Sequence, residues 1–292
     1  MTMVGASPGS AGYRRSRLTG TAFLSLLALY TMLPLGYLLI ASTKTQTDLF
    51  GTFGFAFGHR FALLGNIRDV FRFDGGIFAR WLANTALYSG VAAIGATILC
   101  SAGGYAFARY RFRGRSLLFA IVLGAVMIPQ TALTIPIFLL LSKIGLVDTP
   151  FAVILPSLVF PLGVYLMRVY VEQAVPQDLL DAARLDGAGE FRVFATIAFP
   201  LMTPAAVTVL LLSFVATWNN YFLPLVVLST PSLFPATVGL ASWYQAASAG
   251  GGSQAIFPLV MTGSLLAVVP VLLAFVGLQR FWQGGLAAGG VK

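Results

Sequence analysis

The sequence predicts an all-α integral membrane protein with six transmembrane helices, and three observations support this fold class. Of the 292 residues, 58% are hydrophobic and only 9% are charged, and the mean hydropathy is +0.87. Soluble domains carry about 25% charged residues, so these few charges could not cover a water-exposed surface. The apolar residues also gather in long stretches that charged or Gly/Pro-rich segments separate.

Six of these stretches are long enough to cross a membrane. A spanning helix needs about 20 mostly apolar residues, because the hydrocarbon core is roughly 30 Å thick. An even number of spans places both termini on the same side. The predicted spans cover residues 18–42, 81–108, 116–141, 151–171, 204–229 and 255–282.

The distribution of Lys and Arg predicts the orientation of the spans. Twelve of the 18 cations lie in the amino-terminal segment, the second and fourth loops and the carboxyl-terminal tail, and six lie in the other loops. Cytoplasmic loops carry the excess of Lys and Arg, so both termini are predicted to be cytoplasmic. Five cations in the first loop, residues 43–80, oppose this assignment.

The predicted spans contain no acidic residue and no histidine. Proton-coupled transporters bury a carboxylate or histidine in the membrane, because a group there must change its protonation state. We therefore expect the energy for transport to come from another subunit. An ion-coupled secondary transporter is the alternative, since backbone carbonyls can bind sodium. One cysteine and one histidine predict no disulfide and no metal site, and the thinly spread charge of +9 predicts no nucleic-acid binding.

Small residues recur every four positions in the second span and predict a smooth packing ridge. Such residues let helix backbones approach closely, either within the chain or at a subunit interface. The ridge consists of Ala92, Ala96, Cys100, Gly104 and Ala108.

The few polar and amphipathic side chains in the spans are candidates for a substrate pathway. Amides and aromatic faces suit an uncharged, hydroxyl-rich ligand, whereas a phosphate or carboxylate would require Arg or Lys. Hydrogen bonding between helices and anchoring at the membrane interface are the alternative roles. The candidates are Asn84, Tyr88, Gln130, Trp218, Asn219, Asn220 and Tyr221.

The segment between the fourth and fifth spans predicts a helix, a glycine corner and a second helix. Pro176 suits a helix start, Gly187 ends the first helix, and Glu190 opens a second helix that Pro200 ends. Residues 172–192 carry a net charge of −3. The cytoplasmic leaflet is itself anionic, so a protein groove is the expected partner of this segment.

The same segment resembles the EAA loop of ABC importer permeases. That pattern reads EAA, three residues, Gly, nine residues, and then Ile, any residue, Leu and Pro. Here Asp181-Ala182-Ala183 is followed by Gly187 and, after nine residues, by Ile197-Ala198-Phe199-Pro200. The spacing is kept, while Asp replaces Glu and Phe replaces Leu.

The resemblance extends beyond the loop. Residues 81–282 resemble the type-1 permease domain, and the chain is similar to the six-helix, maltose-type permeases of the carbohydrate-uptake group. Met127-Ile128-Pro129, Trp218-Asn219-Asn220 and the glycine-rich ending support this. The implied division is a tail, first helix and extracytoplasmic loop over 1–80, the permease domain over 81–282, and a cytoplasmic tail over 283–292.

The resemblance implies that the loop forms a coupling helix that docks in an ATPase subunit. The residues at that contact would be Asp181, Ala182, Ala183, Asp186 and Gly187. The implied partners, beside membrane lipid, are a second homologous permease, two ATPase subunits that bind ATP and Mg²⁺, and an extracytoplasmic solute-binding protein. The chain contains no GxxxxGK[ST] pattern, so we expect it to bind no cofactor and to have no enzyme activity.

The expected function is the import of a neutral sugar or oligosaccharide across the bacterial inner membrane. Glycerol phosphate and polyol permeases share many of the features and are the alternative. A membrane enzyme is a further alternative, but the spans hold no base for one. The extracytoplasmic loops 43–80 and 230–254 are predicted to dock the binding protein, with Trp243, Tyr244 and the Gly-rich stretch 249–252 as contacts in the second loop.

Overall fold

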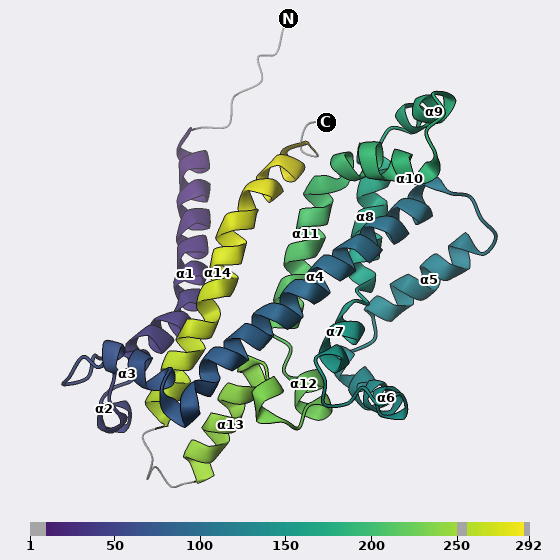
Figure 1. The fold of residues 1–292 in the computed structure, drawn as a ribbon. Helices are drawn as coiled ribbons and strands as arrows, with labels where there is room; N and C mark the ends of the chain where they lie inside the picture. Colours follow the sequence, from purple (N-terminus) through teal and green to yellow (C-terminus); the bar gives the residue numbers. More distant parts are fainter. Residues whose placement is uncertain (1–9, 250–255, 289–292) are drawn as a thin grey trace, which may run out of the picture.

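The computed structural model describes residues 10–249 and 256–288, and all regular structure in these ranges is helical (Figure 1). The predicted all-α membrane fold is confirmed. Five helical stretches have the length and apolarity to cross a membrane, and a bent pair of helices supplies a sixth in the described part of the chain. The longest helices are α1 (Ser10–Ser42), α4 (Ile77–Arg109), α11 (Phe199–Trp218) and α14 (Phe257–Ala288).

Shorter helices complete the spans and connect them. The bent pair is α5 and α6, and α7 with α8 forms the fourth span. Their bounds are α2 (Gln46–Gly51), α3 (Leu63–Val70), η1 (Phe73–Gly76), α5 (Arg115–Val126), α6 (Gln130–Lys143), α7 (Phe151–Ser157), α8 (Pro161–Ala174), α9 (Gln177–Leu185), α10 (Glu190–Val193), η2 (Phe194–Ala198), α12 (Phe222–Val227), η3 (Pro231–Leu233) and α13 (Ala236–Ala249).

Helix α4 runs obliquely through the molecule and packs along α8 and α11 (Figure 1). The small-residue ridge faces these helices, since Ala92, Ala96 and Cys100 are at most 1% exposed. At Gly104 a Cβ atom would lie 2.4 Å from Cβ of Met167 on α8, so only glycine allows this approach. The ridge therefore packs within the chain, which was one of its two predicted uses.

The third predicted span, 116–141, is not one continuous helix. It consists of α5 and α6, whose axes differ by 107° across residues 127–129. Pro129 has no N–H to continue the helix, and its ring restricts Ile128 to non-helical backbone angles. The run of apolar residues was identified correctly, but the sharp bend was not.

The fifth predicted span, 204–229, is displaced along the chain. The continuous helical stretch covers residues 190–218, and α12 follows as a separate short helix. Pro200 does not end the second helix of the loop, contrary to the prediction. A π-turn over Phe194–Ala198 precedes it, and the proline falls in the first turn of α11. The backbone N–H groups in the first turn of a helix have no partner within that helix, so the N–H that proline lacks is not needed there.

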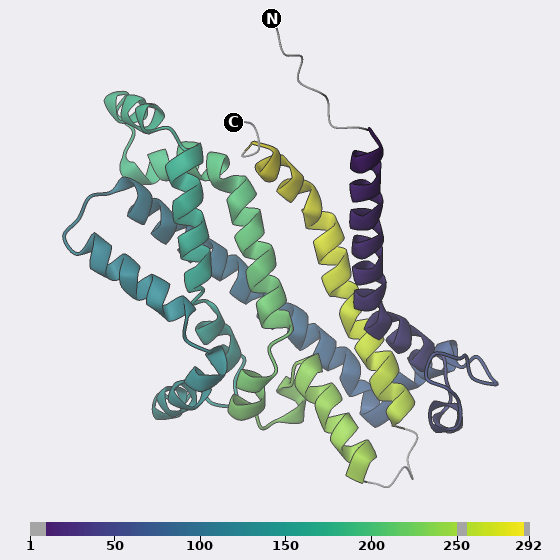
Figure 2. The same ribbon diagram turned by 180° about the vertical axis from the view of Figure 1, so that it is seen from behind.

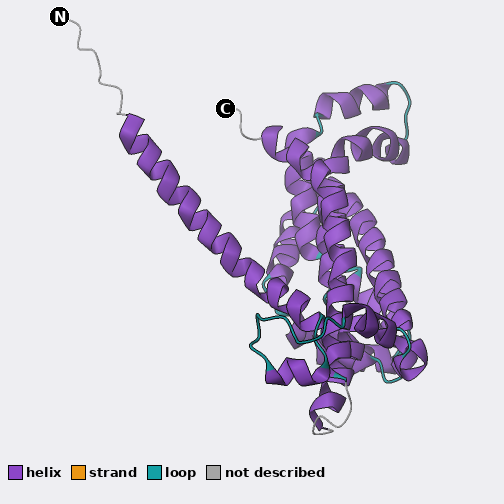
Figure 3. Ribbon diagram, turned by 90° about the vertical axis from the view of Figure 1, so that its left-hand side faces the viewer, coloured by secondary structure: helices purple, strands orange, loops and turns teal. Residues whose placement is uncertain are grey.

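The two ends of the molecule differ in content. Helix α1 begins and α14 ends at the end that carries α9 and α10, while α2, α3 and α13 lie at the opposite end (Figures 1 and 2). Helix α1 contacts α14 and slants away from the other helices, as Figure 3 shows. No residue in the apolar window of α1 is buried, so this helix faces lipid or a partner subunit. Residues 289–292 of the predicted glycine-rich tail lie outside the described ranges.

Candidate functional site

The segment between α8 and α11 forms the predicted helix, glycine corner and helix. Pro176 precedes the first residue of α9, and its fixed φ suits a helix start. Gly187 has a φ of +83°, in the left-handed region that only glycine adopts without strain. Glu190 then opens α10. The corner thus places α9 outside the helical bundle at the end where α1 begins (Figure 1).

One face of this segment is fixed to the bundle and the other is exposed. Leu180 and Val193 are fully buried in a core cluster that includes Met167 of α8. Leu185 and Phe191, in contrast, are 89% and 83% exposed. An apolar surface on a short, firmly held helix is typical of a site that binds another protein.

Charged groups connect the two helices of the segment. The guanidinium of Arg184 donates to Oδ1 of Asp181 at 2.7 Å and to Oε1 of Glu190 at 2.8 Å. The hydroxyl of Tyr110, at the end of α4, donates to Oε2 of Glu190 at 2.6 Å. The hydrogen bonds to Glu190 and Asp181 raise the pKa of Arg184, so its charge is permanent. This cluster ties α4, α9 and α10 together.

Arg109 makes a second connection at the same end of α4. Its Nη2 atom donates to the carbonyl oxygen of Val171 at 2.6 Å and to that of Val175. These carbonyls belong to the last turn of α8 and the residue after it, and that of Val171 also accepts the backbone N–H of Val175 at 3.2 Å. A cation at a helix carboxyl terminus is also favoured by the helix dipole. Arg109 therefore fixes the start of the α9 segment.

The five predicted coupling residues lie together in this segment. Asp181 is exposed and accepts a second hydrogen bond, from Nε2 of Gln177 at 3.0 Å. Ala182 is exposed, while Ala183 is half-buried against the core cluster. Asp186 follows the last residue of α9 and is exposed, beside the Gly187 corner. Their role in binding an ATPase stays a prediction.

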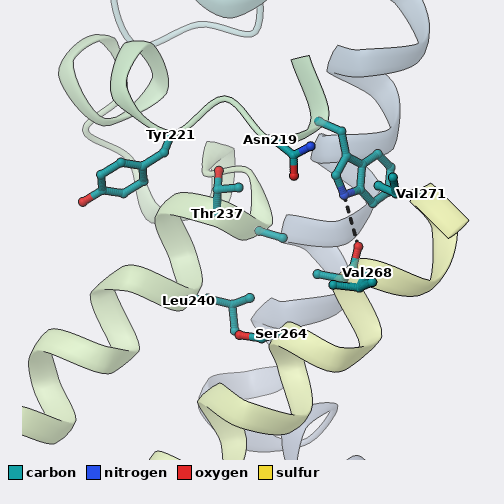
Figure 4. Close-up of a pocket in the computed structure, with 10 residues that line it drawn as sticks. Asn219, Tyr221, Thr237, Leu240, Ser264, Val268 and Val271 are labelled. Carbon is teal, nitrogen blue, oxygen red and sulfur yellow. Dashed lines mark hydrogen bonds between the residues drawn. The ribbon is translucent and has the colours of Figure 1, made fainter. Parts of the chain in front are cut away.

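The predicted pathway residues do not form a single group. Trp218, Asn219 and Tyr221 line a pocket of about 420 Å³ between the end of α11, the start of α13 and α14 (Figure 4). The other residues that line it are Ala236, Thr237, Leu240, Ser264, Ala267, Val268 and Val271.

The pocket carries neutral polar groups on apolar walls and has no charged residue among those that line it. The indole N–H of Trp218 donates to the carbonyl oxygen of Ala267 at 3.1 Å, the bond drawn dashed in Figure 4. The hydroxyl of Thr237 donates to the carbonyl oxygen of Asn220 at 2.9 Å. Such a lining suits a neutral, hydroxyl-bearing ligand better than an anion.

The remaining pathway candidates lie elsewhere. The amide of Asn84 donates to the carbonyl oxygen of Ser232 at 2.8 Å, and the hydroxyl of Tyr88 donates to that of Leu233 at 2.9 Å. Asn220 accepts a hydrogen bond from the backbone N–H of Leu223 at 3.4 Å, at the start of α12. Gln130 is exposed at the first turn of α6.

The two predicted binding-protein contacts differ in accessibility. Trp243 is 5% exposed, and its ring centroid lies 4.9 Å from that of Trp81 and 5.3 Å from that of Phe73. Tyr244 is 53% exposed. Burial assigns Trp243 to packing, so Tyr244 is the member of the pair available to a partner. Residues 250–252 of the Gly-rich stretch lie outside the described ranges.

Sequence reasoning missed two groups of residues. Thr237 and Ser264 line the pocket, but a single hydroxyl in an apolar run or a predicted loop is a weak signal. The contacts of Arg184 were also missed, although its position three residues after Asp181 on an acidic helix favours an ion pair. The contact between Tyr110 and Glu190 joins residues 80 positions apart and has no local signal.

The fold and the site together define the class of multi-span transport permeases. Membrane-length helices carry a neutral pocket between α11, α13 and α14, and an exposed helix and glycine corner lie at one end of the bundle. Within that class, the chain belongs to the family of binding-protein-dependent transport system inner membrane components, whose model matches residues 77–283. It is thus the membrane-spanning permease component of such a system.

Individual relatives cover nearly the whole chain. The arabinooligosaccharides transport system permease protein AraQ of Halalkalibacterium halodurans is 35% identical over 274 residues, 94% of each chain. The lactose transport system permease protein LacG of Rhizobium radiobacter is 32% identical over 91% of this chain and 93% of the relative. A chain in the crystal structure of a bacterial ABC transporter that imports the acidic polysaccharide alginate matches with a TM-score of 0.79. That match covers 95% of this chain and all of the other at 24% identity, and it confirms the fold.

Proposed function

We propose that the chain is the permease subunit of an ATP-driven importer and receives its driving force through α9 and the Gly187 corner. The single observation that carries this proposal is the two-sided construction of the segment. Leu180 holds it to the core at 0% exposure, while Leu185 presents an apolar side chain at 89% exposure. A force applied to the exposed face would therefore reach α8 and α11 through packed side chains.

The proposed substrate is a neutral sugar or oligosaccharide. The pocket offers the amide of Asn219 and the hydroxyls of Thr237 and Ser264 without a charged residue beside them. A phosphate or carboxylate would require a cation there, so glycerol phosphate fits this pocket less well than an uncharged sugar. Relatives named for arabinooligosaccharides, lactose and maltodextrin transport support the same class.

The proposed assembly contains this chain, a second homologous permease, two ATPase subunits and an extracytoplasmic solute-binding protein. ATP and Mg²⁺ would be bound by the ATPase subunits, because this sequence has no GxxxxGK[ST] pattern. In the proposed orientation α9 and both termini are cytoplasmic. The end that carries α13 and the exposed Tyr244 then faces the binding protein.

Reconstitution of the assembled transporter in liposomes tests the proposal. We expect uptake of an arabinooligosaccharide to require both ATP and the binding protein, and to be independent of sodium and proton gradients. Asp181→Lys combined with Gly187→Val should reduce ATP-dependent uptake at least tenfold and weaken attachment of the ATPase. Uptake driven by an ion gradient without ATP would instead establish a secondary transporter.

A matched control separates position from charge. For Asp181→Lys alone, Asp178→Lys is the control, since it makes the same charge change on the same helix at an exposed position outside the predicted contact residues. We expect it to retain most of the uptake. An equal loss in both variants would assign the effect to the net charge of α9 and would contradict a specific role of Asp181.

A further inference from the structure

Two arginines in the connection between α4 and α5 lack partners in the described part of the chain. Arg111 and Arg113 are exposed, and neither forms an ion pair or hydrogen bond with another described residue. Phe112 lies between them and is 40% exposed. Two free guanidinium groups from residues next to an exposed aromatic residue in the sequence are suited to bind an anion at a membrane surface.

Neighbouring arginines are already engaged, which sets Arg111 and Arg113 apart. Arg109 binds backbone carbonyls, as described above. Arg168 donates to Oε1 of Glu172 at 2.9 Å, and Nη2 of Arg115 lies 3.8 Å from the same oxygen. The connection between α4 and α5 therefore carries two positive charges, on Arg111 and Arg113, that no other described residue neutralises.

An apolar groove lies between α4, α5 and α8. Its volume is about 320 Å³, and its lining includes Leu99, Ile121, Ala125, Phe160 and Val164. The thiol of Cys100, which also lines it, donates to the carbonyl oxygen of Phe160 at 3.3 Å. Water needs polar partners in a cavity, and this groove offers few, so hydrocarbon is its fitting occupant.

Aromatic rings connect the arginines to the region of the groove. The ring of Phe112 is 5.9 Å from that of Phe107, which is 5.4 Å from that of Phe119, and Phe119 is 6.4 Å from Tyr165 on α8. Ile121 in the groove is six residues after Arg115 on α5, about 9 Å along the helix at 1.5 Å per residue. An acyl chain is long enough to reach from a headgroup at the level of Arg115 to the groove at Ile121.

We propose that this chain binds one anionic phospholipid between α4, α5 and α8. Arg111 and Arg113 hold its phosphate, and one acyl chain occupies the groove. Charge complementarity favours an anionic lipid over a zwitterionic one, because a zwitterionic headgroup brings its own cation, which the two unpaired arginines would repel. The proposed orientation places this lipid in the cytoplasmic leaflet. The binding itself requires neither transport nor ATP hydrolysis, so it can be tested apart from the proposed function.

Titration of the purified, assembled transporter with pyrene-labelled phosphatidylglycerol measures this binding. We expect the double variant Arg111→Gln/Arg113→Gln to raise the dissociation constant about 30-fold, since each arginine near a lipid surface contributes about 1 kcal/mol and 1.4 kcal/mol is a tenfold change. Labelled phosphatidylcholine should bind the unmodified transporter more weakly than phosphatidylglycerol. The control Arg68→Gln/Arg72→Gln, at the opposite end of the molecule, should leave both constants unchanged.

A groove variant tests the acyl-chain half of the proposal. Ala125→Phe fills the groove, and we expect it to weaken binding of both lipids by the same factor. An unchanged constant in the arginine variant, or equal binding of the two lipids to the unmodified transporter, would overturn the proposal. A photo-crosslinker at Ile121 that captures the second permease instead of lipid would also overturn it, because the groove would then be a subunit interface.

Discussion

The two ends of α4 are held in place by different kinds of interaction. At the α13 end, neutral side chains donate to backbone carbonyls of the connection before α13: Trp81 to Pro231 at 2.8 Å and Tyr88 to Leu233 at 2.9 Å. Both side chains are 2% exposed. At the α9 end, Tyr110 and Arg184 meet on Glu190, whose side chain is 53% exposed.

This difference predicts different mechanical behaviour. Buried neutral hydrogen bonds each contribute about 1 kcal/mol and are costly to break, because the partner is left unsatisfied. Exposed ion pairs contribute about 0–1 kcal/mol and are weakened by salt. The α13 end of α4 is therefore a fixed joint. The α9 end of α4 also has packed and backbone contacts, through Leu180 and Arg109, but its exposed charged bonds make it the more adjustable joint. Our proposal that α9 moves with an ATPase would require such a joint.

The largest expected effect is at the fixed joint. Trp81→Ala should lower the free energy of unfolding by about 3 kcal/mol, because it removes a buried ring and leaves a cavity. It also removes the hydrogen bond to Pro231 and the contact with Trp243. Thermal unfolding of the detergent-solubilised protein measures the loss. Tyr244→Ala, an exposed aromatic at the same end, is the control and should change stability by less than about 0.5 kcal/mol.

The corner at the α9 end should show an intermediate effect. Gly187 has open space around its Cα, so a new side chain meets no atom, but its φ of +83° strains any other residue. Gly187→Val should cost about 1–2 kcal/mol. Asn tolerates the left-handed region better, so Gly187→Asn should cost clearly less. Equal losses in the two variants, measured by the same unfolding assay, would show that backbone conformation does not set the corner.

A matched pair of hydrogen-bond deletions contrasts the two joints directly. Glu190→Gln should cost about 0.5 kcal/mol at low ionic strength and almost nothing in 1 M salt, since it removes the charge of a partly exposed ion pair with Arg184. Tyr88→Phe should cost about 1 kcal/mol at either salt concentration. Unfolding measured at both ionic strengths tests the pair. A salt-dependent Tyr88→Phe or a salt-independent Glu190→Gln would contradict the assigned difference.

The smallest expected effect concerns an ionic contact at the α13 end. Hydrogen bonds from His59 and Thr45 lower the pKa of Asp48 from 3.8 to about 2. The carboxylate form therefore stabilises the folded state above pH 3.8, and this contribution is lost as the pH falls through about 2. Asp48→Asn cannot titrate, so the stability difference between it and the unmodified protein should shrink between pH 4 and pH 2. A constant difference over that range would refute the assignment.

The sequence predicted those parts of the fold that follow from local chemistry. Hydropathy located the spans, and Pro176 and Gly187 predicted the bounds of α9. The break after Val126 was missed because a proline in an apolar run is compatible with either a mild kink or a sharp bend. The continuation through Pro200 was missed because it depends on a π-turn over residues 194–198.

The site was predicted less completely than the fold. The coupling segment is continuous in sequence, so its residues could be found together. The pocket draws Asn219, Thr237 and Ser264 from three parts of the chain, and only tertiary packing brings them together. Asn84 was predicted as a pathway residue from its polarity, while its hydrogen bonds to residues 232 and 234 follow from long-range pairing that the sequence does not show.

The central claim is that the exposed face of α9 binds the ATPase. Site-specific photo-crosslinking in the assembled transporter tests it most directly, with a photoreactive amino acid in place of Leu185, which is 89% exposed. We predict capture of an ATPase subunit from Leu185, and no such capture from Leu180 in the core or from Tyr244 at the other end. Capture of lipid alone from Leu185, or of the ATPase from Tyr244, would contradict the claim.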